Sequence, residues 1–219
     1  MEQKKIALLL LYRRRQRRLH YIRQRICWIH PYNTLRKEKG DFYTKFIDLR
    51  EHEDKFFIYF RMSKSSFDEL HGRLKDSLQH QRIVRDCIEP VEMLAVTIRY
   101  LASGCTFTDL HLNYRLGIST VSKIVNEVCF SIWRVMLPDC MPTPSKEMWE
   151  KISEEFEKRA NFPHCIDAVD GKHIRIINPL GSKYYNYKGY SSIVLMAVAD
   201  TNYRFVHVDI GSYGKDYDS

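Results

Sequence analysis

Between residues 41 and 160, apolar side chains recur every three or four positions among charged ones, which is the spacing of amphipathic helices. Ser63 precedes one such stripe and has a side chain typical of a helix N-cap, so a helix is predicted to start there. Pro90 suits the first turn of another helix, and Gly104 suits its end. The predicted helices therefore include residues 63–78, 90–103 and 145–159.

The segment Thr106–Val128 has the pattern of two helices joined by a tight turn at Gly117, with Ser119 capping the second helix. This spacing fits a helix-turn-helix, a motif whose second helix lies in the major groove of DNA. A helical hairpin that merely packs against its neighbours fits the same pattern. The side chains predicted to reach DNA are Ser119, Thr120, Ser122, Lys123 and Asn126, and those predicted to face inward are Val121, Ile124, Val125 and Val128.

From Phe162 the pattern changes to short, β-branched runs bounded by Gly, Asp and Asn, which predicts strands. Asp200–Tyr203 is the expected hairpin turn between the last two strands. The predicted fold class is therefore α/β (α+β), a helical N-terminal region followed by the first part of a mixed, mainly antiparallel sheet domain. The predicted strands are Cys165–Val169, His173–Ile177, Ser191–Ala199 and Arg204–Ile210.

The 219 residues carry a formal net charge of +8 and a pI near 9.1, which favours a polyanionic partner. Basic residues are concentrated at the start of the chain and predict an arm that ends near Gly40. The arginine cluster at 13–18 is either a nuclear-localisation or DNA-contacting segment, or a solvated helix face. The predicted domains are an arm (1–40), a helical region (41–160) with its helix-turn-helix at 106–128, and the beginning of a sheet domain (161–219).

Other features exclude several classes of protein. The six cysteines are scattered without the close pairs of a zinc or redox motif, so they are predicted to be free thiols. The apolar run Ile6–Tyr12 is short and arginines follow it, so neither a signal peptide nor a membrane span is predicted. An RNA-binding protein receives little support because the chain has no RNA-recognition aromatic motif or GXXG loop.

Asp170 is the first candidate for chemistry, because an apolar run ends there in Asp-Gly-Lys-His. Its carboxylate is predicted to project at a strand edge, where it suits Mg²⁺, an ion held by one or two carboxylates together with water and substrate phosphate. Two-metal phosphoryl-transfer sites use several such carboxylates. The alternative is structural, because Asp-Gly is a common turn dipeptide and Asp170 then simply starts a hairpin.

Four successive blocks of the second half resemble the PIF/Harbinger DDE transposases and their host-domesticated nuclease relatives. The resemblance extends upstream through the helix-turn-helix and covers nearly everything after the basic arm. It implies an RNase H-like catalytic core that cuts DNA by metal-assisted hydrolysis. The blocks are NFPHCIDAVDGKHIRI (161–176), GSKYYNYKGY (181–190), SIVLMAVAD (192–200) and DIGSYGK (209–215).

The resemblance also implies roles for particular residues. It puts the first catalytic, metal-holding aspartate at Asp170 and the second at Asp218, with Mg²⁺ or Mn²⁺ as the cofactor. Asp216 stands where the family more often has an uncharged residue, which leaves the second position open between the two aspartates. The family's remaining acidic residues lie beyond Ser219, so the catalytic domain is expected to be incomplete and the chain inert alone. A Myb-like partner protein and a location in the nucleus, with the cytoplasm as a second location, are further implications.

The tyrosine-rich block has two interpretations. In the first, Lys188 and its neighbouring tyrosines line the DNA path. In the second, Tyr185 and Tyr187 pack on the sheet and Lys188 is solvated. His173 either lies near the acidic site or caps the hairpin. The predicted function is a metal-dependent DNA endonuclease of Harbinger transposase descent. The alternative is a non-catalytic DNA-binding or protein-interaction module.

Overall fold

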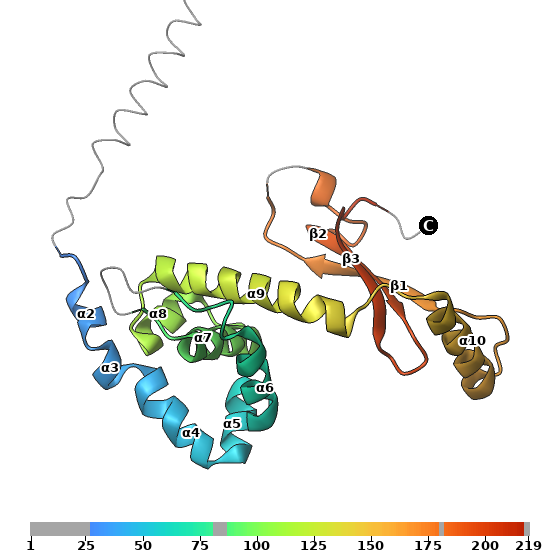
Figure 1. The fold of residues 1–219 in the computed structure, drawn as a ribbon. Coiled ribbons are helices and arrows are strands. Elements are labelled where there is room, and N and C mark those ends of the chain that lie inside the picture. The colour runs from blue at the N-terminus through green and yellow to red at the C-terminus, as the bar shows by residue number, and fades with distance from the viewer. Residues whose placement is uncertain (1–26, 81–86, 180–181, 217–219) are drawn as a thin grey trace, which may run out of the picture. The chain divides into compact units, whose positions relative to one another are not determined.

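The computed structural model describes residues 27–80, 87–179 and 182–216 (Figure 1). The chain divides into two compact units. The first unit, Met1–Cys129, is helical in its described part, and the second, Phe130–Ser219, contains the three strands. The division lies within one continuous helix, Ile118–Cys140. Pro138 lies inside this helix, which is 23 residues long.

Most helix ends of the first unit follow local signals in the sequence. Ser63 accepts a hydrogen bond from Ser66 N at 3.1 Å, as an N-cap does, but its helix ends at Leu74 instead of Leu78. Pro90 opens the next helix, and Gly104, with φ of 64°, closes it as predicted. The helices are α2 (Pro31–Thr34), α3 (Arg36–Lys39), a π-helical turn η1 (Phe42–Phe46), α4 (Ile47–Glu51), α5 (Glu53–Phe60), α6 (Lys64–Leu74), α7 (Pro90–Ser103), α8 (Phe107–Tyr114) and α9 (Ile118–Cys140).

Five phenylalanines form the aromatic part of the first unit's core. Phe42 and Phe46, four residues apart, stack with their ring centroids at 4.9 Å, and Phe56 and Phe60 repeat this spacing on α5 at 4.7 Å. Phe67 of α6 lies 5.5 Å from the ring of Phe46. All five side chains are buried, and aromatic pairs at such distances add stability beyond the area they bury.

A buried ionic group joins the early helices to α7. Glu92 is completely buried, and its carboxylate lies 3.6 Å from the guanidinium of Arg36 and accepts a hydrogen bond from the hydroxyl of Tyr43 at 3.2 Å. Burial raises the pKa of Glu92, while Arg36 opposes this shift; burial, together with Glu92, raises the pKa of Tyr43 to about 12. Residues 30–40, read from the sequence as part of an arm, are therefore held by tertiary contacts.

The second unit contains α10 (Lys146–Ala160) and an antiparallel sheet in the order β1-β2-β3. Its strands are β1 (Ala168–Arg175), β2 (Ser192–Ala199) and β3 (Phe205–Tyr213), and a short 3₁₀ turn, η2 (Ser182–Tyr184), lies between the first two. Ser145 caps α10 through Met148 N, as expected for the predicted helix.

The strand prediction was wrong around Asp170. Two short strands were expected with a turn at Asp170-Gly171, but both residues lie inside β1, opposite Ala197 and Met196 of β2. The continuous apolar strand β2 offers a hydrogen-bonding partner along the whole of β1, and this pairing overrides the local turn preference of Asp-Gly. The turn at Asp200–Tyr203 is confirmed, since Asp200 Oδ1 accepts hydrogen bonds from Asn202 N and Arg204 N.

These elements confirm a helical region followed by an antiparallel sheet, the coarse form of the predicted α+β class. All six cysteines are free thiols, as predicted. No helix within the described ranges is long and apolar enough to cross a membrane.

The buried carboxyl of Glu92 is expected to make stability fall as the pH rises. Burial raises its folded-state pKa above the ordinary value of 4.5, so the folded chain holds this proton more tightly than the unfolded chain does. The free energy of unfolding therefore decreases as the pH rises from the ordinary value through the raised one. Tm, measured by circular dichroism across this interval, should fall relative to that of Glu92→Gln, which cannot titrate there.

The exposed Glu38→Gln variant of α3 controls for the loss of one carboxylate. A Tm difference between wild type and Glu92→Gln that stays constant with pH would contradict this role of Glu92.

Candidate nucleic-acid interface and acidic site

Helices α8 and α9, the two helices of the predicted helix-turn-helix, are joined by a short connection, Arg115–Gly117. The first helix begins with a capping box, in which Thr106 Oγ1 accepts from Asp109 N at 3.2 Å and Asp109 Oδ2 accepts from Thr106 N at 2.9 Å. The hydrogen bonds from Thr106 lower the pKa of Asp109. The start of α8 is thus fixed by local sequence.

The turn between these helices depends on Arg115 and not on the glycine. Arg115 has the left-handed conformation, with φ of 52°, whereas Gly117 has no positive φ. The guanidinium of Arg115 lies 4.1 Å from the ring centroid of Tyr32 and donates to Tyr32 O at 2.9 Å. The hydroxyl of Tyr32 in turn donates to Leu112 O at 2.7 Å. A residue from α2 therefore holds the turn.

The start of the second helix also differs from the prediction. Helix α9 begins at Ile118, and Gly117 O accepts its first hydrogen bond from Val121 N at 2.9 Å. Ser119 therefore lies inside the helix and is not its N-cap. The reason is that Gly117 leaves the turn directly into helical geometry, one residue earlier than the serine.

The predicted two-sided pattern of α9 is confirmed in its burial. The inward side chains are 0 to 5 % exposed, and the predicted DNA-contacting side chains lie on the other side. Asn126 uses one donor within the helix, to Ser122 O at 2.8 Å. The buried residues are Val121, Ile124, Val125 and Val128, the exposed ones are Ser119, Lys123 and Asn126, and Thr120 and Ser122 are half-buried.

Asp170 lies at the third position of β1 and is exposed. The β1–β2 ladder has no irregularity, so side chains alternate strictly along β1 and His173 lies on the opposite face of the sheet from Asp170. Asp209 is also on that opposite face, because it pairs with Met196 while Asp170 pairs with Ala197. The structure therefore separates Asp170 from both of these residues.

The second predicted carboxylate cannot be placed in the same way, because Asp218 lies outside the described residues. Its neighbour Asp216 has a local role: its carboxylate accepts a hydrogen bond from Tyr213 N at 2.8 Å, and its own N–H donates to Tyr213 O. Asp216 thereby closes the turn that follows β3.

Of the two carboxylates predicted to hold metal, Asp170 and Asp218, only Asp170 lies in the described part of the chain. Among residues 27–80, 87–179 and 182–216, no group of three or more His, Cys, Asp or Glu side chains is arranged to hold a metal ion. The carboxylate of Asp170 accepts a hydrogen bond from Gly171 N at 2.9 Å. The described residues do not by themselves form a metal centre.

Sequence reasoning missed the residue that organises the tyrosine-rich block. Asn186 is buried, and its side-chain oxygen accepts hydrogen bonds from Lys188 N at 3.0 Å and Tyr190 N at 3.2 Å. Its amide nitrogen donates to Ser192 Oγ at 2.9 Å, and His173 Nδ1 lies 3.0 Å from the same hydroxyl. An asparagine three residues before a glycine is a turn signal that could have identified it. His173 therefore belongs to a structural hydrogen-bond network.

The tyrosines and Lys188 of this block have different surroundings. The ring of Tyr184 packs against Tyr213 at 5.2 Å between centroids, whereas Tyr185 and Tyr187 are exposed. Lys188 is exposed at the loop, with Nζ 5.3 Å from the ring centroid of Tyr187. The predicted DNA contact of Lys188 stays a prediction.

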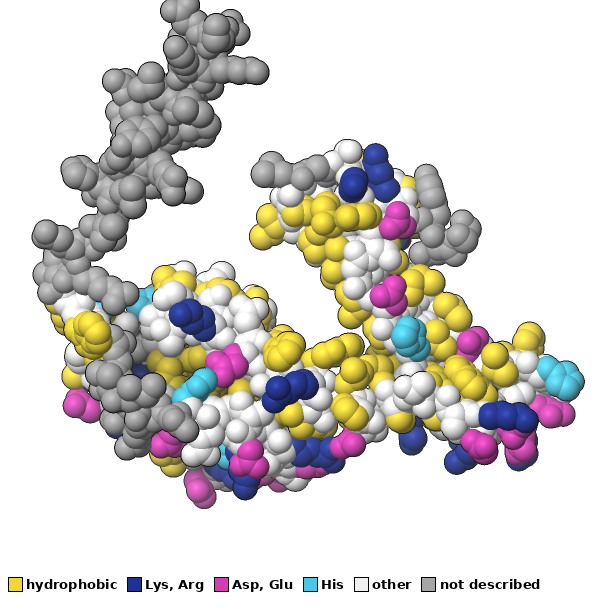
Figure 2. All heavy atoms as spheres, turned by 45° about the horizontal axis from the view of Figure 1, so that its top comes forward, with side chains coloured by type: hydrophobic (Ala, Val, Ile, Leu, Met, Phe, Trp, Pro, Cys, Tyr) yellow, Lys and Arg dark blue, Asp and Glu magenta, His cyan; other side chains and the backbone are white. Residues whose placement is uncertain are grey.

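Apolar side chains remain exposed on the sheet, and Figure 2 shows hydrophobic side chains over much of its visible surface. They come from both edge strands. The exposed set includes Val169, Ile174, Phe205, Ile210 and Tyr213.

No protein-family model, curated protein or solved structure matches the chain.

Gly214 is expected to be indispensable for the loop that follows β3. A Cβ there would lie 2.6 Å from Ser192 Oγ and 2.7 Å from Ser192 O, and would also meet the carbonyl of Tyr184. Because backbone atoms cannot move aside easily, Gly214→Ala should lower the free energy of unfolding by about 1–3 kcal/mol. Urea unfolding of the second unit, followed by the fluorescence of its tryptophans, measures this change.

Gly72→Ala in α6 is the matched control, because a Cβ there meets nothing within 4 Å and alanine favours a helix. Equal stability of Gly214→Ala and wild type would show that the loop is not packed as described.

Proposed function

We propose that this chain is a DNA-binding protein of Harbinger transposase descent and that α9 is the helix that contacts DNA. The observation that carries the proposal lies in residues 119–128 of α9, directly after a short turn, where four apolar side chains are buried while Ser119, Lys123 and Asn126 are exposed. In a helix-turn-helix, the exposed side of the second helix reaches base edges and phosphates. A net charge of +8 supports a polyanionic partner.

The polar types on α9 support DNA over a packing partner. Lys123 can neutralise a phosphate, and Asn126 is of a type that reads adenine in the major groove. We therefore favour DNA binding by α9 over a helical hairpin that only packs.

Lys123→Gln is expected to weaken binding to duplex DNA by the contribution of one phosphate contact. The slope of log K against log salt concentration should decrease in magnitude by about 1. Fluorescence anisotropy with a labelled duplex of mixed sequence, titrated at several salt concentrations, measures both affinity and slope.

Lys75→Gln, which removes an exposed lysine after α6, is the control with the same net charge. Equal losses in the two variants would mean that binding follows overall charge and would overturn the assignment of α9.

The second part of the proposal is endonuclease activity, with Mg²⁺ or Mn²⁺ as cofactor and Asp170 as one metal-holding residue. Asp170 is exposed inside a strand, so its presence is not explained by a turn. Divalent ions in phosphoryl-transfer sites are often held by few carboxylates until the substrate phosphate arrives. Asp218, a Myb-like partner and a nuclear location belong to the same proposal and rest on the family resemblance.

Asp170→Asn is expected to weaken Mn²⁺ binding by about tenfold or more, because it removes a charged ligand. Electron paramagnetic resonance of free Mn²⁺ during titration, in the presence of duplex DNA, measures the affinity. Asp209→Asn should leave it unchanged, because Asp209 is on the other face of the same sheet.

Identical Mn²⁺ affinities of Asp170→Asn and wild type would remove Asp170 from the site. In that case, with DNA binding through α9 retained, the function would be that of a non-catalytic DNA-binding module. The lack of a three-ligand metal group among the described residues favours this second candidate.

A further inference from the structure

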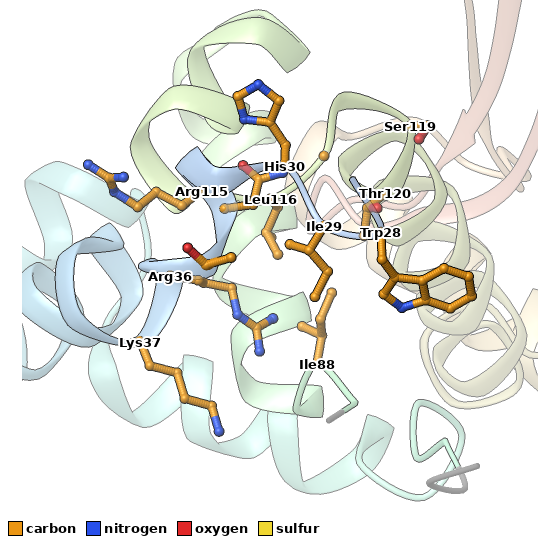
Figure 3. Close-up of a pocket in the computed structure, with 13 residues that line it drawn as sticks. Trp28, Ile29, His30, Arg36, Lys37, Ile88, Arg115, Leu116, Ser119 and Thr120 are labelled. Atoms are coloured by element: carbon orange, nitrogen blue, oxygen red, sulfur yellow. The ribbon is translucent and has the colours of Figure 1, made fainter. Parts of the chain in front are cut away.

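A cavity lies between the α2–α3 segment and the start of α9 (Figure 3). Ser119 and Thr120, two of the proposed DNA contacts, are among the residues that line it, so it belongs to the interface of α9 already described. The outer edge of β1, in the second unit, is a separate surface that the proposed DNA contacts of α9 do not use.

Strand β1 is an open edge of the sheet in the described part of the chain. The strand order is β1-β2-β3, so among the described strands β1 has a neighbour on one side only. Its eight residues, Ala168–Arg175, all pair with β2 without an irregularity, and none of them is a proline. The pairing of β3, at the other edge, has two register shifts, and bulges of this kind hinder the addition of another strand. Strand β1 is therefore the edge better suited to accept a further strand.

The backbone groups that point outward from this edge belong to the odd-numbered residues of β1. Just after the strand, Ile176 N donates to Ser191 O at 2.9 Å, and the regular pairing extends this direction to the even-numbered residues. The N–H and C=O of Gly171 therefore point away from β2. Gly171 N donates to the carboxylate of Asp170 at 2.9 Å, so an exposed side chain satisfies this donor where another strand could do so.

The charges along β1 match those of a second copy that runs antiparallel to it. A two-fold axis at Gly171 places Asp170 of each copy opposite Lys172 of the other. Both side chains are exposed, and they lie on the same face of the sheet. In this register they form a non-hydrogen-bonded pair, in which side chains on adjacent strands come closest. Two pairs of opposite charge therefore form across one axis.

Neighbouring registers lose this match. An axis at Asp170 puts two aspartates opposite each other, and an axis at Lys172 puts two lysines opposite each other, which destabilises a sheet. An axis one residue further in either direction places both charged side chains opposite apolar residues. The axis at Gly171 also places Asp167, just before the strand, opposite Arg175 at its end. The charge pattern thus selects a single register.

We infer that β1 pairs with β1 of a second copy of this chain, antiparallel and centred on Gly171. The pairing joins two three-stranded sheets into one continuous sheet and covers part of Val169 and Ile174, which are 57 % and 36 % exposed in the single chain. The N–H of Gly171 donates to the second copy, and the carboxylate of Asp170 turns to the lysine. The inference does not rest on the proposed function. A metal ion at Asp170 competes with this lysine, so the dimer is the metal-free form.

Sedimentation equilibrium of the full chain, without DNA or divalent metal, tests this dimer. The wild type should form dimers, and Lys172→Asp should weaken association by about tenfold or more, because both cross-strand pairs become repulsive. Asp170→Lys should have a similar effect. The double variant Asp170→Lys, Lys172→Asp should associate as the wild type does, because the exchange restores both pairs. Lys215→Asp, an exposed lysine after β3, controls for the change in net charge.

Three outcomes would overturn the inference. The first is a wild-type chain that stays monomeric up to its solubility limit. The second is equal association of Lys172→Asp and the wild type, which would mean that the copies meet elsewhere. The third is a double variant that is folded by circular dichroism but does not recover the dimer.

Failure of the dimer and failure of the metal site have different signatures. If the wild type is monomeric while Asp170→Asn loses affinity for Mn²⁺, the dimer is wrong and the metal proposal stands. If exchanging the two charges restores the dimer while the wild type does not bind Mn²⁺, the dimer stands and the metal proposal is wrong.

Discussion

The middle of helix α7, from Glu92 to Ile98, is buried, and the packing of the first unit depends on covering it. Met93, Leu94, Val96 and Ile98 are all buried, and α5, α6, α8 and η1 each contact this helix. Because a helix that is apolar on most sides is unstable in water, its neighbours must form in concert with it. The carboxylate of Glu92 enters this core from the first turn, and Arg36 and Tyr43 offset the cost of burying it.

Local signals in the sequence were sufficient for many helix ends and for the sides of α9. Caps such as Ser63 and Ser145, the proline at the start of α7 and the glycine at its end act within one helical turn. The spacing of the apolar residues in α9 likewise predicts which side of this helix is buried. Features that depend on a distant partner were missed, such as the extended conformation of Asp170-Gly171, which the pairing with β2 maintains. Helices α2 and α3 were missed because four residues are too few to show a helical periodicity.

In the candidate site, too, the features set by local sequence were predicted and those set by a distant partner were not. Asp170 and the polar residues of α9 were identifiable from residue type and spacing, and their exposure agrees with a role at the surface. The separation of His173 from Asp170 follows from strand alternation, which became visible only once β1 was known to be continuous. Asn186 was overlooked because the conspicuous tyrosines and Lys188 around it drew the functional interpretation, although its own side chain makes the contacts that shape the loop.

The contact between Tyr32 and Arg115 joins residues that are 83 positions apart in the chain. Arginine rarely adopts the left-handed conformation, so this turn persists because the tyrosine holds the guanidinium and the backbone together. The direction in which α9 leaves the turn is consequently set by a side chain outside the helix-turn-helix. The orientation of α9 therefore depends on α2 as well as on the two helices that the turn joins.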